Sequence, residues 1–203
     1  MLSKVFKQRV RQGVRPLVSA LAGAGVTPNA LTITGLLLSC VVGIVLALGY
    51  EAAGGLLFLF AGLFDTLNGA VARQTNRVTV FGSFLDSTLD RYAEALVFGG
   101  LLVLYTGRGL VVEVALVYAV IIGSLMVSYA RARAEGLGLD CEVGWLQRPE
   151  RIALLGLGLI FGLAVPVLWL LAVFTNFTVA QRMLHVYRLT QRAGAAGGKG
   201  GLS

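Results

Sequence analysis

The chain has 203 residues, of which 57% are hydrophobic and only 13% are charged, and its formal net charge is +7. This composition excludes an ordinary soluble domain and predicts a protein that crosses a membrane several times. The positive charge does not indicate a nucleic-acid partner, because the basic residues flank apolar stretches, as membrane topology requires.

The first segment, residues 1–22, mixes five basic side chains with apolar ones. This pattern predicts an amphipathic helix that lies on an anionic membrane surface, although a plain basic tail that only sets the topology would also explain it. Next, Thr27 and Pro28 predict a helix start, with Thr27 as the N-cap and Pro28 in the first helical position.

Six apolar stretches follow, and each predicts a transmembrane helix. We expect them at roughly residues 29–48, 52–73, 80–105, 110–128, 148–164 and 167–179, with the fourth continuing as a polar helix to Glu135 and Pro166 separating the last two. The predicted fold class is therefore an all-α integral membrane protein, with six transmembrane helices preceded by an N-terminal interfacial helix. Residues 1–188 would form one membrane domain, and residues 189–203 a disordered tail.

The distribution of arginine and lysine predicts the orientation of these spans. With the N-terminus inside, the loops after the second and fourth spans and the C-terminal segment also lie inside, and only Arg108 falls outside. Cytoplasmic loops carry the excess of basic residues. We therefore expect a multi-pass protein of the plasma membrane, with both termini and the active site on the cytoplasmic side.

Acidic residues interrupt the apolar sequence of the second and third spans. One helical face of the second span carries Asp65, Asn68, Gly69 and Ala72, and the third span carries Asp86 and Asp90 one turn apart. Ionised carboxylates inside a membrane are costly and mark functional sites. If the two faces meet, they form an oxygen-rich cage that suits Mg²⁺, with Mn²⁺ as an alternative.

Such a cage could serve a cation pathway or a metal-dependent active site. The residues around it favour the active site, because Gly69, Ala72 and Gly82 leave room for a flat or phosphorylated group at the helix backbone. Arg73 can pair with a phosphate. Together these features suit a nucleoside diphosphate bridged to a metal ion. A carrier or channel would explain the carboxylates but not the small residues and the arginine.

The spacing of these residues is D-x2-N-G-x2-A-R-x8-G-x3-D-x3-D, and it resembles the D-x2-D-G-x2-A-R-x8-G-x3-D-x3-D signature of the CDP-alcohol phosphotransferase (CDP-alcohol phosphatidyltransferase) family. The matching residues are Asp65, Gly69, Ala72, Arg73, Gly82, Asp86 and Asp90. The resemblance implies six spans after an interfacial helix, and a homodimer. It also implies transfer of a phosphatidyl group from CDP-diacylglycerol or its ether-lipid equivalent to an alcohol, with release of CMP.

The resemblance also implies roles for single residues. The metal ligands would be Asp65, Asn68, Asp86 and Asp90, and the CDP-lipid pocket would be lined by Gly69, Ala72, Arg73 and Gly82. Asp90 would also be the base that takes the proton of the acceptor hydroxyl. Asn68 departs from the signature: its amide oxygen can coordinate a hard cation but carries no charge. A weakened or inactive enzyme is therefore conceivable, as is a site in which a water or nucleotide oxygen fills in.

Arginines gather at the end of the fourth span (SYARAR, residues 128–133) and the start of the fifth (RPER, residues 148–151). They predict an anion site, so we expect an acceptor that carries its own phosphate. Both segments resemble the branch of the family that makes phosphatidylinositol phosphate from inositol 1-phosphate; glycerol 3-phosphate is the rival acceptor. The resemblance assigns the acceptor phosphate to Ser128, Arg131, Arg151 and an arginine near the end of the sixth span, Arg182 or Arg188.

Overall fold

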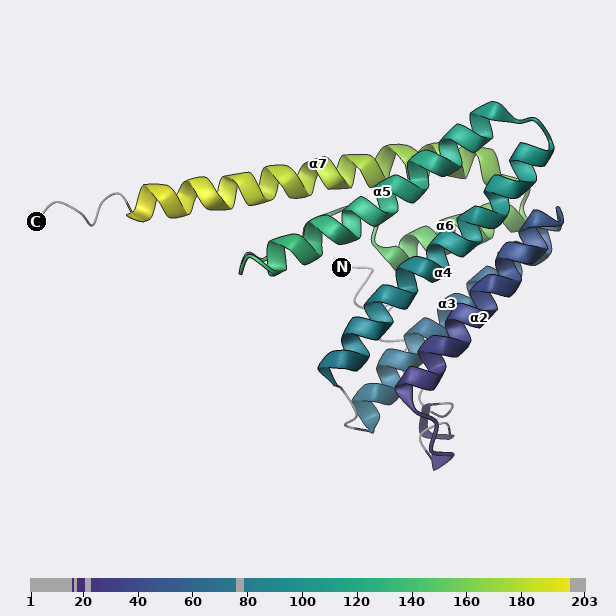
Figure 1. Ribbon diagram of the computed structural model, residues 1–203, viewed down its shortest axis with the longest axis horizontal. Helices are drawn as coiled ribbons and strands as arrows, with labels where there is room; N and C mark the ends of the chain where they lie inside the picture. The colour runs from purple at the N-terminus through teal and green to yellow at the C-terminus, as the bar shows by residue number, and fades with distance from the viewer. Residues whose placement is uncertain (1–15, 17, 21–22, 76–78, 198–203) are drawn as a thin grey trace, which may run out of the picture. The chain divides into compact units, whose positions relative to one another are not determined.

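The computed structural model describes residues 16, 18–20, 23–75 and 79–197, and regular structure in this part of the chain is helical only (Figure 1). The helices are α2 (Pro28–Ala47), α3 (Glu51–Gln74), α4 (Val80–Gly107), α5 (Val111–Glu135), α6 (Arg148–Ile160) and α7 (Ala164–Gly197). The chain divides into two compact units, residues 1–104 and 105–203. The all-α fold class is thus confirmed for the described residues.

In the first unit, the start of α2 follows the sequence prediction. Thr27 is the N-cap, and its Oγ1 accepts a hydrogen bond of 3.2 Å from the backbone N–H of Ala30. Pro28 occupies the first turn, where the N–H that it lacks would have no partner within the helix. α2 and α3 pack side by side (Figure 1).

The segment before α2 packs against the same pair of helices. Val18 is buried in a cluster with Leu31 of α2 and with Leu67 and Val71 of α3. Apolar burial of this kind is worth about 1.5–3 kcal/mol for each large side chain. The predicted interfacial helix, residues 1–22, otherwise lies outside the described residues, apart from residues 16 and 18–20, which are helical.

A glycine contact brings α2 and α4 together. A methyl group added at Gly43 of α2 would lie 2.6 Å from the backbone oxygen of Leu96 in α4, and one added at Gly100 would overlap the backbone of Gly43. Only residues without a side chain allow two helix backbones to approach this closely. The crossing therefore fixes α4 against α2, and with it the acidic residues that α4 carries.

In the second unit, α7 packs against α5 along much of its length and also against α6 (Figure 1). Gly123 of α5 faces the side chain of Thr175 in α7, with no room for a methyl group between them. α6 begins with a capping box, in which the Glu150 carboxylate accepts a 2.8 Å hydrogen bond from the N–H of Gln147. This cap fixes the helix start at which Arg151 lies.

The last two helices differ from the prediction. The break falls at Gly162, whose φ of +69° favours glycine, and Pro166 lies in the first turn of α7 instead of between the helices. Proline is tolerated there because a first-turn N–H has no intrahelical partner. α7 also continues to Gly197, well beyond the predicted end of the sixth span, so the tail proposed from residue 189 is helical as far as the described residues extend.

By length and composition, four of the described helices could cross a membrane: α2, α3, α5 and residues 164–191 of α7. α4 is long enough, but its first fifteen residues include Asp86, Asp90, Arg91 and Glu94. α6 has 13 residues, fewer than the roughly 20 that a perpendicular span needs.

Candidate functional site

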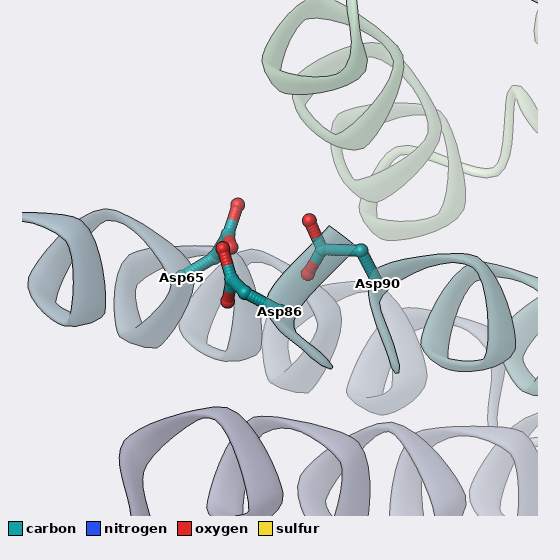
Figure 2. Close-up of side chains that lie close together, drawn as sticks. All are labelled: Asp65, Asp86 and Asp90. Carbon is teal, nitrogen blue, oxygen red and sulfur yellow. The ribbon is translucent and has the colours of Figure 1, made fainter. Parts of the chain in front are cut away.

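Three aspartate side chains converge within the first unit. One carboxylate oxygen from each of Asp65, Asp86 and Asp90 lies within 4.8 Å of the others, and all three residues are half-buried. Figure 2 shows Asp65 on one helix and Asp86 and Asp90 one turn apart on another, with their carboxylates on the same side. The structure therefore brings together the three carboxylates that the sequence placed on two separate helical faces.

This donor set fits a divalent cation. Carboxylates this close repel one another, and partial burial weakens the screening by water, so an added positive charge would be favourable. Carboxylate oxygens are hard ligands, which Mg²⁺ and Mn²⁺ prefer. Arg91 lies beside Asp90, with its Nη1 3.8 Å from Asp90 Oδ2. At that distance and exposure the pair offsets little of the negative charge.

Asn68 lies beside this group but contacts it through nitrogen. Its Nδ2 donates hydrogen bonds to Asp86 Oδ1 at 2.6 Å and to Thr32 Oγ1 at 2.5 Å. Thr32 Oγ1 lies 3.1 Å from Asp86 Oδ1 and 3.3 Å from the carbonyl oxygen of Pro28, and its one proton can be donated to either, with the shorter contact to Asp86. The Asn68 side chain is buried, and its Oδ1 has no hydrogen-bond partner within the described residues.

The residues predicted to line the CDP-lipid pocket occupy the last turns of α3 and the first turn of α4. Arg73 is exposed, and its guanidinium folds back over Gly69, where a methyl group would lie 3.3 Å from Nη1. Gly82 donates its N–H to Thr79 Oγ1 at 2.9 Å, and a methyl group there would meet Asn29 Oδ1 at 3.3 Å. Ala72 is half-buried. The side chains of Arg73, Thr79 and Asn29 therefore lie over the backbone at Gly69 and Gly82.

The arginines predicted to bind the acceptor phosphate all lie in the second unit. Arg151 and Arg182 are buried, with 3% and 5% of their surface exposed, whereas Arg131 is exposed and Ser128 half-buried. Arg131 and Arg151 lie close enough to Arg182 for their charges to repel it. A group of like charges that is partly removed from water is stabilised by a bound anion.

Arg182 also links one helix to another helix and to a loop through hydrogen bonds. Its Nε donates to the carbonyl of Val143 at 2.9 Å and its Nη1 to the carbonyl of Val127, so it joins α7 to α5 and to the loop before α6. Arg151 donates from Nη1 to the carbonyl of Leu146 at 3.2 Å. Arg131 donates instead to Glu135 Oε1 at 2.7 Å, in an exposed ion pair. Arg188, the other arginine considered for this role, is exposed further along α7.

Sequence reasoning missed the part played by Thr32. A threonine near the start of a helix is more often a cap, and Thr27 already serves as one for α2. The hydroxyl of Thr32 lies one turn further along and reaches a carboxylate 54 positions away in the chain. Its only sequence signal is a polar side chain on the buried face of an apolar helix.

Comparison with known proteins assigns the family. Residues 25–186 match the profile of the family described as CDP-alcohol phosphatidyltransferase. The chain belongs to this family. Its apolar helices and this membership together indicate a membrane protein.

Relatives of similar length support the assignment. The chain is 35% identical to an archaetidylinositol phosphate synthase of Methanothermobacter thermautotrophicus, over 90% of this chain and 93% of the relative. It is 40% identical to a phosphatidylinositol phosphate synthase of Mycobacteroides abscessus, over 88% and 84% of the two chains. Both relatives are named as synthases of a lipid inositol phosphate.

Solved structures show the same fold. The chain resembles the Mycobacterium tuberculosis phosphatidylinositol phosphate synthase with CDP-DAG bound, with a TM-score of 0.79 and 32% identity, over 85% of this chain and 92% of that one. A complex of that synthase with manganese and citrate gives a TM-score of 0.77 and 33% identity, over 85% and 88% of the chains. The manganese complex agrees with a divalent metal at the acidic cluster described above.

Proposed function

We propose that this chain transfers a phosphatidyl group from a CDP-linked lipid to the hydroxyl of inositol 1-phosphate and releases CMP. The convergence of Asp65, Asp86 and Asp90 is the observation that carries the proposal, because their spacing is that of the family signature. The relatives named as inositol phosphate synthases support the choice of acceptor. The lipid donor is CDP-diacylglycerol or its ether-lipid equivalent, since relatives of both kinds match.

In this proposal the carboxylates of Asp65, Asp86 and Asp90 hold the divalent cation, Mg²⁺ or Mn²⁺. When bound, the cation neutralises negative charge on the pyrophosphate and polarises the reacting phosphorus. Gly69, Ala72 and Gly82 carry little or no side chain, so the nucleotide can approach the backbone there once the Arg73 side chain moves off Gly69. Arg73 is exposed and can swing from Gly69 to a phosphate oxygen.

Asp90 is the residue that accepts the proton. The acceptor hydroxyl oxygen forms a bond to the lipid-side phosphorus, and the bond from this phosphorus to the CMP oxygen breaks. The hydroxyl proton passes to the Asp90 carboxylate, and CMP leaves with the electron pair of the broken bond. A positioned carboxylate can serve as a general base for such a hydroxyl.

The phosphate of the acceptor is held by Arg151, Arg182, Arg131 and Ser128. Buried Arg151 supplies the strongest contact, because a guanidinium removed from water gains most from an added anion. Arg131 would have to exchange its carboxylate partner Glu135 for the phosphate. Arg182 is favoured over Arg188 because it is buried and is electrostatically coupled to Arg131 and Arg151.

We further propose the arrangement in the membrane. Six membrane helices, α2 to α7, follow an interfacial helix at residues 1–22, with both termini and the site on the cytoplasmic side of the plasma membrane. With 13 residues, α6 crosses only where the bilayer is locally thinned. The basic residues at the ends of the spans support this orientation. α4 spans although it is acidic, because its charged residues all lie within its first fifteen residues and the rest of the helix is apolar. The functional state is a homodimer.

A turnover screen tests the function. The purified full-length chain in detergent is given CDP-diacylglycerol or its ether analogue, and CMP release is measured with inositol 1-phosphate, glycerol 3-phosphate or free inositol, each with Mg²⁺ and with EDTA. We expect release with inositol 1-phosphate and Mg²⁺ only. Faster CMP release with glycerol 3-phosphate would identify glycerol 3-phosphate as the acceptor in place of inositol 1-phosphate.

One observation favours a second candidate. Asn68 stands where the signature has a carboxylate, so the chain could be a relative that binds the CDP-linked lipid without turning it over. CDP-diacylglycerol binding without CMP release, with every acceptor tested and with Mg²⁺ or Mn²⁺, would identify this case.

A further inference from the structure

Asn68 Nδ2, Thr32 Oγ1 and Asp86 Oδ1 form a closed triangle of hydrogen bonds. Both N–H groups of its amide are used, one by Asp86 Oδ1 and one by Thr32 Oγ1. The Thr32 hydroxyl completes the triangle by donating to the same Asp86 oxygen at 3.1 Å. Asp86 Oδ1 therefore accepts two hydrogen bonds, and Asp86 Oδ2 lies outside this set.

We propose that Asn68, together with Thr32, is a positioning residue that holds the Asp86 carboxylate in its metal-binding orientation before any cation arrives. The inference rests on the proposed function only in taking Asp86 as a cation ligand. It gives Asn68 a different role from the one expected from sequence, in which the amide oxygen is itself a ligand.

The orientation of the amide follows from its surroundings. If the side chain were turned over, Asn68 Oδ1 would face Asp86 Oδ1 at hydrogen-bond distance, and no proton would lie between the two oxygens. The observed orientation leaves Oδ1 buried without a partner, which is unfavourable for a carbonyl group. The hydrogen bond from the amide nitrogen to the charged Asp86 oxygen offsets this cost, because such bonds are about twice as strong as neutral ones.

The family signature has an aspartate where this chain has Asn68, and this difference changes how the Asp86 carboxylate is ordered. An aspartate at position 68 would put a second carboxylate oxygen about 2.6 Å from Asp86 Oδ1, where the amide nitrogen now lies. Two ionised oxygens at that separation need a proton or a cation between them. Asn68 supplies the proton itself. In this chain the Asp86 carboxylate is therefore ordered without metal, whereas a carboxylate pair would depend on the metal to become ordered.

The test is the thermal unfolding midpoint of the full-length protein in detergent, with no lipid or acceptor present, in EDTA and in excess Mg²⁺. Asn68→Asp should lower the midpoint in EDTA by about 5 °C, the effect of losing a charge-assisted hydrogen bond in a chain of this size. Mg²⁺ should restore most of this loss, so the Mg²⁺-induced rise becomes larger than in the natural chain. A residue with a merely structural role would give the same loss with and without Mg²⁺.

A swap of the two groups makes the test specific. The double change Asn68→Asp with Asp86→Asn puts the amide on α4 and the carboxylate on α3, so it re-forms the same pair, and it should recover most of the midpoint in EDTA. Thr32→Val removes the hydroxyl that donates to Asp86 and accepts from Asn68, but it keeps the Asn68–Asp86 hydrogen bond, so it should give a smaller loss. Gln191→Glu is the matched control: Gln191 is exposed near the end of α7, and the change adds the same charge without altering Asn68, Thr32 or Asp86. Its midpoints should match those of the natural chain.

Two results would overturn the inference: an Asn68→Asp midpoint in EDTA equal to that of the natural chain, or a swap variant no more stable than Asn68→Asp. If Asn68→Asp does not fold, the swap decides alone: a folded swap variant supports the inference and an unfolded one rejects it. None of these measurements needs turnover. Failure here therefore leaves the proposed reaction standing, and failure of the CMP assay leaves this inference standing.

Discussion

Replacing Gly100 with alanine should loosen the crossing of α2 and α4 that supports the acidic cluster. A methyl group at Gly100 would meet the Cα and carbonyl carbon of Gly43 at 2.8 Å, whereas carbon atoms in contact prefer about 3.5–4.0 Å. The obstructing atoms belong to the backbone, so they cannot turn aside as the end of a side chain would. The two helices must separate by roughly 1 Å to restore ordinary contact.

The cost can be estimated from overpacking in other cores. Forcing one extra carbon into a packed contact costs about 1–3 kcal/mol. In a chain of about 200 residues this lowers the unfolding midpoint by roughly 3–10 °C. Separation of α2 from α4 would also lengthen the bond between Thr32 and Asp86, which now measures 3.1 Å. The rise of the midpoint on adding Mg²⁺ should therefore change as well.

Gly99 provides a control one residue away on the same helix. A methyl group at Gly99 would meet no atom within 4 Å, and glycine to alanine in a helix gains up to about 1 kcal/mol. Gly99→Ala should therefore melt at or above the midpoint of the natural chain, as followed by the helical circular dichroism signal in detergent. Equal midpoints for the Gly99 and Gly100 variants would refute the argument that the α2–α4 crossing requires a glycine.

Three further predictions concern the reaction. Asp90→Asn should lower the rate of CMP release by about 100-fold or more while CDP-lipid binding, measured by equilibrium titration, persists; a smaller loss would move the base elsewhere. Arg151→Gln should raise the KM for inositol 1-phosphate by about 10-fold or more, with little change in the KM for CDP-lipid; equal changes in both KM values would count against a phosphate contact. Arg182→Gln should destabilise the protein and raise the acceptor KM, because buried Arg182 both ties α7 to α5 and lies near the other arginines, whereas Arg188→Gln should change neither; the opposite order would identify Arg188 as the contact.

Much of the fold could be read from local pattern. The bounds of α2, α3 and α4 fall within about two residues of the predicted spans, because an apolar run long enough for a membrane and the Thr27–Pro28 cap are local signals. The same holds for the start of α6, which the RPER segment marked. The acidic residues were also predictable, since a fixed spacing on a helix places them on one face.

The break before α7 was less predictable. The break was predicted at Pro166 because proline ends helices, yet proline is also tolerated in the first turn of a helix. Gly162, the residue that makes the turn, resembles the other glycines of an apolar segment. The length of α7 was underestimated for a related reason: hydropathy marks where a membrane ends, but a helix continues wherever its polar residues still favour helix and one face can pack.

By itself, the sequence determined the all-α class, the family signature and the residue types at the carboxylate cluster. The tertiary structure decided which atoms meet. It turned the nitrogen of Asn68 toward Asp86, brought Thr32 to the same oxygen, and buried Arg182 against carbonyls 39 and 55 positions away. Such contacts join residues far apart in the chain, and their geometry depends on how whole helices pack, which no local pattern records.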